Sequence, residues 1–493
     1  MPSSSQEQQR EVTEYRILAL YRFLPLVDGK KSSSSDNNTS EESWDEQALM
    51  KHPERHPQLI QLQAELYSTL RRYETRGTLL IAPEGINGTI CYPYPPPVVT
   101  DTNDNDDDPV KSFITNHPLF GGEDLRTRSS VWKENNEQND SNNNSSQPQQ
   151  AFQRLKIKIK PEIVTLGLGR PITDHATHIP SPVPERHQYN QLANPNITKG
   201  KYLNPRQWDD AMRDPNVLVI DTRNSYEIDI GTFESAVDPC TNHFSEFPEY
   251  LEKLAGEYDW SGEQLNGSSN ETKATTTSRN GSKEQSTTGK KPPPTAIAMF
   301  CTGGIRCEKA TSYALQSNLF PQNLPIYHLE GGILSYLDDV AKRDKEEDKE
   351  GGGGSSSTFH GECFVFDKRV ALTEGLEPSN KYISCHGCRG PMDRRLMEDI
   401  ADNGGKASNV GDGNNIELEK KRQEYEQLLM GIRNLPPLTY DSDSQRWYVP
   451  GLTCPRCHDG TTRESFERFA QRKEQMEICA REGKSHFQDN GRK

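Results

Sequence analysis

The chain has 493 residues, enough for about three domains, but only 31% of them are hydrophobic, which is too few for that much packed core. Its formal net charge of −15 argues against indiscriminate binding to nucleic acid or anionic lipid, so any polyanion site must be a local basic surface. No apolar run is long enough for a membrane helix, and the N-terminus lacks the pattern of a secretory signal. We therefore expect a partly disordered, cytoplasmic protein without a membrane partner, whose ten cysteines are reduced thiols.

Blocks rich in Ser, Asn, Asp and Gly, or in charges alone, account for the polar excess. They lie at 32–42, 100–108, 134–150, 262–291, 343–357 and 402–415. Their apolar content is too low to offset the entropy lost on ordering, so we interpret them as loop insertions. The rest divides into an N-terminal domain (1–170), a linker (171–200), a central domain (201–345), a C-terminal module (359–470) and a tail (471–493).

The N-terminal domain shows the pattern βαββαβ of a ferredoxin-like, or acylphosphatase-like, fold. Strands are predicted at 15–26, 78–82, 87–92 and 152–164, and helices at 56–73 and 110–117. In the last strand four cations alternate with apolar residues. This cation row consists of Arg154, Lys156, Lys158 and Lys160. It is either an edge strand protected by charge or a face that contacts RNA phosphates.

The central domain alternates strands and helices, which predicts an α/β fold with a parallel sheet. A helix is expected at 205–213, followed by strands at 217–220, 296–300 and 326–329, with a helix ending near 318. Sites in such sheets lie at the carboxyl ends of the strands. Asp221 and Cys301 both stand at such ends. The whole chain is thus expected to be α/β, with an α+β N-terminal part.

Cys301 opens a loop that precedes a predicted helix. The loop continues with Thr302, Gly303, Gly304, Ile305, Arg306 and Cys307. Backbone amides and a helix N-terminus stabilise a thiolate at this place, so Cys301 is predicted to be the nucleophile. The planar guanidinium of Arg306 suits an oxyanion, a phosphate or a nucleobase carbonyl, which makes it the second predicted catalytic residue. Cys307 either resolves an oxidised Cys301 or is a small packed residue.

Three polar residues follow the strand that ends at 220. We expect Asp221, Arg223 and Glu227 to brace the Cys301 loop through an ion pair or a helix cap. Two glycine-rich segments are interpreted as turns. Residues 330–332 are expected to form a tight turn from strand to helix, and residues 82–88 a hairpin turn, with RNA contact as the alternative.

The C-terminal module contains two Cys-x-x-Cys pairs, after a short strand predicted at 363–366. They consist of Cys385, Cys388, Cys454 and Cys457. Two such pairs can complete a tetrahedral site of four sulfurs that is closed and structural, so we predict one zinc ion. The neighbouring His386 and His458 are alternative ligands, and independent free thiols are the competing interpretation. A helix is expected at 417–432 between the pairs.

The spacing Cys-x4-Arg in the loop resembles the active-site loop of rhodaneses. The longer string Cys-Thr-Gly-Gly-Ile-Arg-Cys-Glu-Lys-Ala at 301–310 is similar to one rhodanese subgroup, the tRNA wobble-uridine 5-hydroxylases (TrhO type). Five further stretches agree with that subgroup. They are APEGINGT at 82–89, DTRNSYE at 221–227, FSEFP at 244–248, HLEGGI at 328–333 and GECFVFDKR at 361–369.

The resemblance implies an oxidoreductase that uses O2 to convert uridine to 5-hydroxyuridine at the first anticodon position of tRNA. It also implies a ferredoxin-like N-terminal domain, a central rhodanese domain and an essential Cys301. The electron donor and the oligomeric state stay open. The alternatives are a sulfurtransferase that carries a persulfide and a non-catalytic RNA-binding scaffold. Neutral Thr302, directly after the cysteine, weakens the sulfurtransferase reading because a cation there would favour the thiosulfate dianion.

Overall fold

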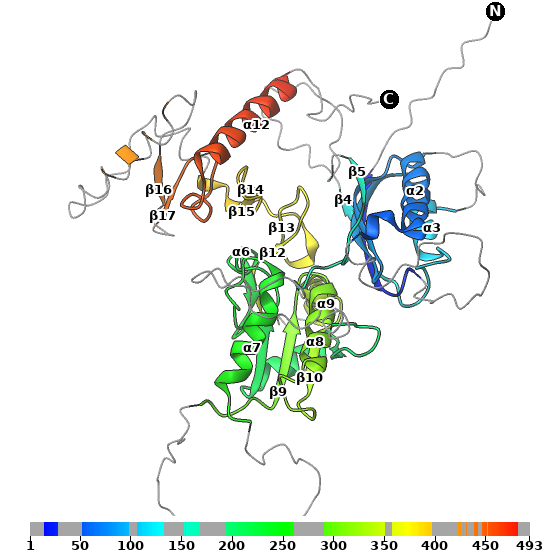
Figure 1. Ribbon diagram of the computed structural model, residues 1–493, viewed down its shortest axis with the longest axis vertical. Helices are drawn as coiled ribbons and strands as arrows, with labels where there is room; N and C mark the ends of the chain where they lie inside the picture. The colour runs from blue at the N-terminus through cyan, green and yellow to red at the C-terminus, as the bar shows by residue number, and fades with distance from the viewer. Residues whose placement is uncertain are drawn as a thin grey trace, which may run out of the picture.

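The computed structural model describes the N-terminal part over residues 14–27, 52–97, 106–132, 152 and 154–167. The central part is described over 193–260 and 290–350, and the C-terminal part over 357–396, single positions between 420 and 430, 438–441, 446–450 and 452–481. Most of the predicted insertions fall outside these ranges. Figure 1 shows the three parts in blue, green, and yellow to red. Within the described ranges, no helix combines the length and apolar character needed to cross a membrane.

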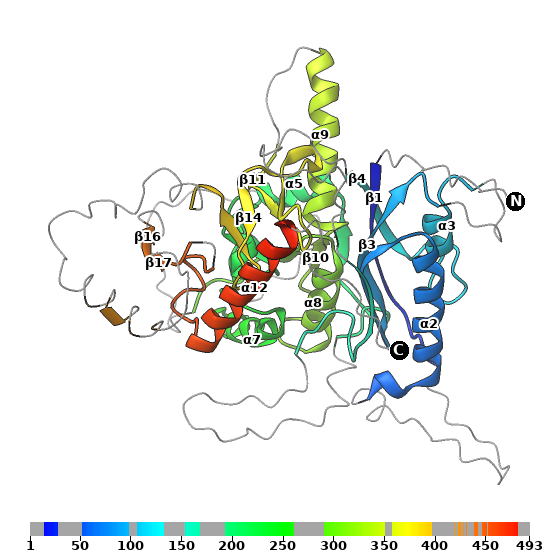
Figure 2. The same ribbon diagram turned by 90° about the horizontal axis from the view of Figure 1, so that it is seen from above.

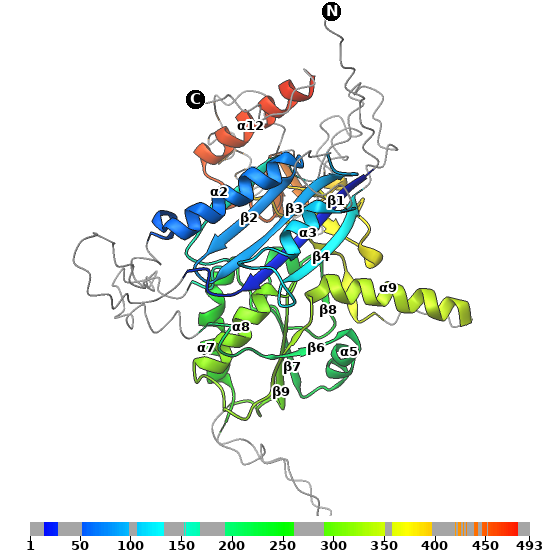
Figure 3. The same ribbon diagram turned by 90° about the vertical axis from the view of Figure 1, so that its right-hand side faces the viewer.

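The N-terminal domain is a five-stranded sheet with helices on one face (Figure 3). The strand order is β4 (Arg126–Trp132), β1 (Glu14–Phe23), β3 (Gly85–Tyr94), β2 (Arg76–Ala82) and β5 (Leu155–Ile159). Helices α2 (Pro57–Arg72) and α3 (Pro109–Thr115) cover the sheet. Buried leucines recur along α2 at helical spacing, and they form one core with the apolar residues of the strands.

The assignment of the fourth strand from sequence is wrong. The segment predicted as that strand contains only the short β5, which pairs parallel to β2 at one edge. The fourth strand of the ferredoxin-like order is β4, which pairs with β1 at the other edge. Pattern analysis missed β4 because residues 126–130 are polar on both faces of the strand, so no apolar alternation is visible.

The sheet face opposite α2 and α3 is polar, and we call it the inner face. Strand register places Arg128, Ala19, Thr89, Thr78 and Lys156 in one row across the sheet. The next row contains Arg126, Tyr21, Asn87, Leu80 and Lys158. Cations therefore stand at both edges of the inner face, while small and neutral side chains occupy its middle.

The central domain contains the predicted parallel sheet. Its order is β6 (Lys201–Leu203), β10 (Ile326–Leu329), β9 (Ala296–Phe300) and β7 (Val217–Asp221). Helices α7 (Phe247–Glu257) and α8 (Ile305–Gln316) share a core with one face, and α5 (Pro205–Arg213) and α9 (Gly332–Glu350) with the other. All of β9 is buried, because both faces of the sheet are covered.

The strands at 217–220, 296–300 and 326–329 are confirmed, but sequence analysis missed several elements. They are β6, α7 and the short α6 (Ser225–Ile228). The interpretation of 343–357 as a loop insertion is wrong at its start, because α9 continues to Glu350. Helical spacing of ion pairs such as Arg343 to Asp339, 2.9 Å apart, supports a charged helix that needs little core contact. Figure 2 shows this helix projecting from the domain.

Within the described ranges, the C-terminal part contains small hairpins and a long helix near its end. Strand β11 (Phe359–Gly361) pairs with β8 (Gly231–Phe233) of the central domain. The predicted strand at 363–366 is shorter, as β12 (Cys363–Phe364), and pairs with β13 (Ala371–Leu372). The hairpins β14–β15 and β16–β17 span Tyr382–Ser384, Pro391–Asp393, Thr439–Asp441 and Arg446–Tyr448. Most of the helix predicted at 417–432 lies outside the described residues, and α12 (Arg463–Arg481) extends into the expected tail.

Candidate active site at the Cys301 loop

The Cys301 loop joins the carboxyl end of β9 to the first turn of α8. A second turn, at residues 330–332, holds it in place: the amide of Ile333 donates to the carbonyl of Cys301 at 2.9 Å. Gly332 has φ +65°, and a Cβ atom there would lie 2.5 Å from the Cys301 oxygen and 2.6 Å from the Thr302 oxygen. Only glycine allows this close approach. The expected tight turn is therefore also the support of the loop.

The surroundings of Cys301 favour the thiolate form of its side chain. Its side chain is 1% exposed, the amide of Gly304 donates to Sγ at 3.0 Å, and Sγ of Cys307 lies 3.7 Å away. Burial raises the pKa of Cys301, but a hydrogen bond from Cys307, the charge of Arg306 and the amides of Cys307 and Gly304 outweigh it and lower the pKa to about 6. Burial also raises the pKa of Cys307 well above its ordinary value. The pKa values of the two thiols are therefore shifted in opposite directions, and Cys301 has the greater thiolate character near neutral pH.

The guanidinium of Arg306 is paired with Glu227. Two terminal nitrogens each donate to one carboxylate oxygen at 2.7 Å, and Glu227 is fully buried. Burial lowers the pKa of Arg306, but the charge and hydrogen bonds of Glu227 outweigh it and raise that pKa. The sequence predicted Arg306 to hold charge on the substrate. In the structure its donor fork is occupied by Glu227, and its charge acts on Cys301 through space.

Asp221 and Arg223 form the expected ion pair, and it is separate from the pair of Arg306 with Glu227. Both side chains are fully buried, and a guanidinium nitrogen lies 2.6 Å from the carboxylate of Asp221. Arg223 also donates to the carbonyl of Gly231 at 2.6 Å, and Thr232 donates to Asp221 at 2.9 Å. This pair therefore fixes the end of β7 to β8, behind the loop.

A cavity of about 910 Å³ lies between the Cys301 loop and the inner face of the N-terminal sheet. Its size is in the range of pockets that hold a nucleotide-sized ligand. Cys301, Thr302, Gly303, Ile305 and Arg306 border it from the loop. Tyr21, Asn87, Arg126, Arg128 and Lys160 border it from the N-terminal domain, and Phe366 and Arg369 from the C-terminal part. Sequence analysis did not anticipate this shared cavity.

A buried lysine joins the N-terminal and central domains. Nζ of Lys309, 3% exposed, lies 2.9 Å from both carboxylate oxygens of Glu84 and 2.6 Å from Glu162. It also donates to the carbonyl of Val164 at 2.9 Å. Residues 82–88 do form the expected hairpin turn, between β2 and β3. The turn has a further role, because Glu84 places the inner face over the loop.

The cation row lies beside this site. Arg154, Lys158 and Lys160 are exposed and Lys156 is half-buried. Burial lowers the pKa of Lys156, and the charges of Arg154, Lys158 and Arg389 lower it further. Arg389, from the C-terminal module, is thus close to the row. A groove of about 600 Å³ runs between α2 and β5, bordered by Tyr67, Gln63 and residues 154–158.

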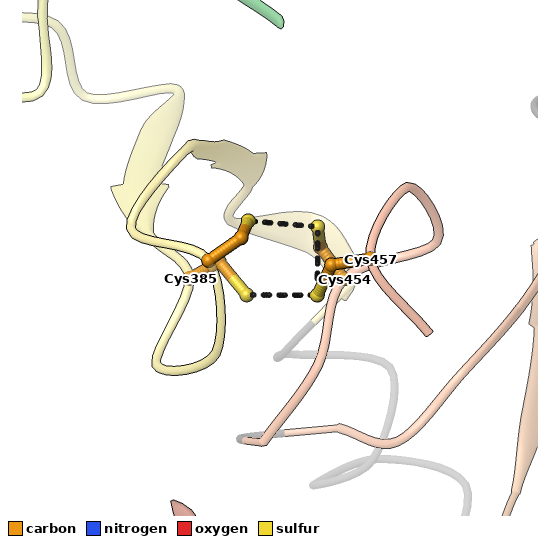
Figure 4. A group of neighbouring side chains, drawn as sticks. Cys385, Cys454 and Cys457 are labelled. Carbon is orange, nitrogen blue, oxygen red and sulfur yellow. Dashed lines mark hydrogen bonds between the residues drawn. The ribbon is translucent and has the colours of Figure 1, made fainter. Parts of the chain in front are cut away.

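The four cysteines of the C-terminal module converge (Figure 4). All their sulfurs lie within 4.8 Å of one another, and three pairs are separated by 3.7 to 3.8 Å. Sulfurs around a tetrahedral zinc ion, with Zn–S of about 2.3 Å, would be about 3.8 Å apart. The cluster therefore fits a metal such as zinc without a histidine ligand. Nδ1 of His458 instead lies 3.3 Å from the hydroxyl of Thr453.

Comparisons with known proteins agree with this architecture. A family model described as UPF0176 acylphosphatase like domain matches residues 54–163. The tRNA uridine(34) hydroxylase of Teredinibacter turnerae (strain ATCC 39867 / T7901) is 30% identical over 479 residues, which cover 97% of this chain and 94% of that protein. A solved structure from Rhodopseudomonas palustris CGA009, a protein of unknown function described as a possible tyrosine phosphatase, is 18% identical over 33% of this chain and 96% of its own. Its TM-score of 0.18 is too low to support a fold argument.

Proposed function

Because this chain belongs to the tRNA uridine(34) hydroxylase family, we propose that its Cys301 cavity is where the wobble uridine of tRNA is hydroxylated. The chain is a tRNA-modifying enzyme of the oxidoreductase type. One observation carries the assignment of the site: the thiol with a pKa lowered to about 6 borders a nucleotide-sized cavity that three parts of the chain build. The central domain that supplies the loop is proposed to be a rhodanese domain.

The proposed reaction begins with addition of the Cys301 thiolate to C6 of uracil. The new S–C6 bond moves the π electrons onto O4, which makes C5 a nucleophilic enolate carbon. C5 then takes one oxygen atom from O2, while an external two-electron donor and two protons reduce the other atom to water. Loss of the C5 proton and departure of the thiolate from C6 restore the ring as 5-hydroxyuridine.

The residues of the loop have separate parts in this scheme. The backbone amides of Thr302–Ile305 are proposed to hold the charge that develops on O4. Arg306, held by Glu227 at 2.7 Å, contributes a fixed positive field and little direct contact. The thiol of Cys307 is fully buried and donates to the Gly304 carbonyl at 2.9 Å, which supports the packed reading over a resolving role.

We propose that tRNA phosphates bind along the cation row. Lys160 of the row also borders the Cys301 cavity, so the row leads toward the loop on the same face of the sheet. Arg389 lies close enough to affect Lys156 electrostatically, which extends the basic surface onto the C-terminal module. On a chain with a net charge of −15, such a local concentration favours a polyanion over mere protection of an edge strand.

The four-cysteine cluster is proposed to hold one structural zinc ion. Zinc would join two hairpin segments that are far apart in sequence and would position Arg389, which directly follows Cys388. Four sulfurs leave no coordination position for water or O2. The metal would therefore act on tRNA docking through the fold of the module.

The deciding experiment replaces Cys301 with Ser in cells that lack the protein, followed by mass spectrometry of wobble nucleosides. Cys301→Ser should leave uridine 34 unmodified, because a hydroxyl has a far higher pKa than this thiol. Cys240→Ser, at an exposed cysteine that does not border the cavity, is the matched control. Restored 5-hydroxyuridine with Cys301→Ser would refute the role of Cys301. Strong thiosulfate-to-cyanide transfer with unchanged wobble nucleosides in the knockout would favour the sulfurtransferase.

A further inference from the structure

Phe366 is an exposed aromatic residue on a firmly held turn. It lies two residues after the end of β12 and is 65% exposed. The amide of Val365 donates to the carbonyl of Val370 at 2.8 Å, and the guanidinium of Arg369 lies 2.6 Å from the carboxylate of Asp367. These contacts close the turn. Exposure of Phe366 therefore reflects its fixed position and is not a result of a loose loop.

The turn is also tied to the N-terminal domain and borders the reactive loop. Arg369 donates to the hydroxyl of Ser130 on β4 at 3.2 Å. Phe366 lines the same cavity as Cys301, with the guanidinium carbon of Arg306 5.9 Å from its ring centroid. Buried Phe364 supports it at a centroid distance of 5.0 Å in an edge-to-face arrangement. Phe366 is thus anchored by Phe364 on one side, while 65% of it stays exposed.

Core packing does not account for this residue. Phe364, 3% exposed, already fills the apolar position beneath the turn. An aromatic face in a cavity beside cationic residues is the arrangement by which proteins hold single-stranded bases, since every base can stack on it. The wobble base of an anticodon loop is such a base.

We propose that Phe366 is the stacking platform for the uracil of uridine 34, a binding role that rests on the proposed function. A thiolate adds to C6 perpendicular to the pyrimidine plane, so the ring must present one face to Sγ of Cys301. A stacking partner on the opposite face would hold that orientation. Phe366 is accordingly a substrate-contacting residue, and Arg369 positions it through the turn.

The test compares Phe366→Ala, Phe366→Leu and Phe366→Tyr in single-turnover hydroxylation of tRNA. Loss of one base–aromatic stack should lower kcat/KM about 5- to 100-fold in the Ala and Leu variants, while Tyr stays within about threefold of the wild type. Total tRNA affinity, set mainly by phosphates, should change little. Ile197→Ala, at another exposed apolar residue (67%), is the control and should match the wild type.

A second readout reports on the stack itself. With 2-aminopurine at position 34 of an anticodon stem-loop, binding to the wild type and to Phe366→Tyr should quench fluorescence, and binding to Phe366→Leu should not. Unchanged kcat/KM in Phe366→Ala, or full activity in Phe366→Leu, would overturn the platform while leaving the proposed function intact. Activity of Cys301→Ser, in contrast, would remove the function on which the platform rests.

Discussion

The thiol of Cys301 should ionise about three pH units below an ordinary cysteine. The structure lowers its pKa from 9.0 to about 6, which corresponds to about 4 kcal/mol of preference for the thiolate. At about pH 7 roughly ten thiolates would exist for each thiol, and at about pH 5 the ratio would reverse. Because the folded-state pKa is depressed, reactivity should fall as pH decreases through about 6 and stay flat above about 8.

The assay is the rate of alkylation by iodoacetamide between about pH 5 and pH 9.5, read at the peptide that contains Cys301. A side chain that is 1% exposed reacts slowly in absolute terms, but limited access does not move the midpoint. The same peptide in denatured protein is the control, and its midpoint should lie between about 8.5 and the ordinary value of 9.0. Cys307→Ala removes the side-chain hydrogen bond that lowers the pKa of Cys301. The midpoint of Cys301 alkylation in this variant should therefore rise by about one pH unit, the equivalent of a hydrogen bond of about 1.4 kcal/mol.

Cys307→Ser keeps a donor at that position and should stay close to the wild type. A midpoint of about 8 or higher in the folded wild type would refute the reasoning that burial is outweighed by the loop. A midpoint that is low but identical in Cys307→Ala would instead refute the contribution of Cys307, and leave Arg306 and the amides as its cause.

Lys309→Met should lower the free energy of unfolding by about 3–5 kcal/mol in chemical denaturation, because it leaves the carboxylates of Glu84 and Glu162 without their cation; a loss under about 1 kcal/mol would contradict this. Gly332→Ala should cut hydroxylation about tenfold or more, since strain of about 1–2 kcal/mol and a steric clash displace the loop; wild-type rates would show that the loop tolerates the shift. Glutamine in place of the whole cation row should flatten the salt dependence of tRNA binding; an unchanged slope would make the row an edge guard. Purified protein should contain one zinc, and its removal should raise hydrogen exchange at 385–396 and 452–457 while the central sheet stays protected; near-zero zinc in reduced protein would refute the site, and iron would reopen the question of oxygen activation.

The hydrophobic pattern of the sequence was sufficient to predict strands that are buried on both faces. Residues 296–300 are apolar throughout because both faces of β9 are covered, and such a strand is visible without any partner. The cysteine pairs were visible because two intervening residues already bring two sulfurs together. Strand β4 was hidden because residues 126–130 are all polar, those that line the cavity as well as those between them.

The partners of charged groups could not be read from sequence. Glu227 and Arg306 are 79 positions apart and meet only because α6 lies beside the loop. Lys309 and Glu84 are 225 positions apart and belong to different domains. Helix or strand periodicity reports which face of an element is buried, but it carries no information on how two domains are oriented. The sequence therefore could not show that Glu227 occupies the hydrogen-bond donors of Arg306. Without that partner, Arg306 was predicted to hold charge on the substrate directly.

The cavity that the three parts of the chain share has a consequence for the history of the molecule. Strand β11 completes a ladder with β8 of the central domain, and Lys309 binds a turn of the first domain. A recombination event that replaced one part with a homologous segment would have to preserve the residues that form both of these contacts. Substitutions on one side of either contact should therefore be tolerated only with compensating changes on the other side.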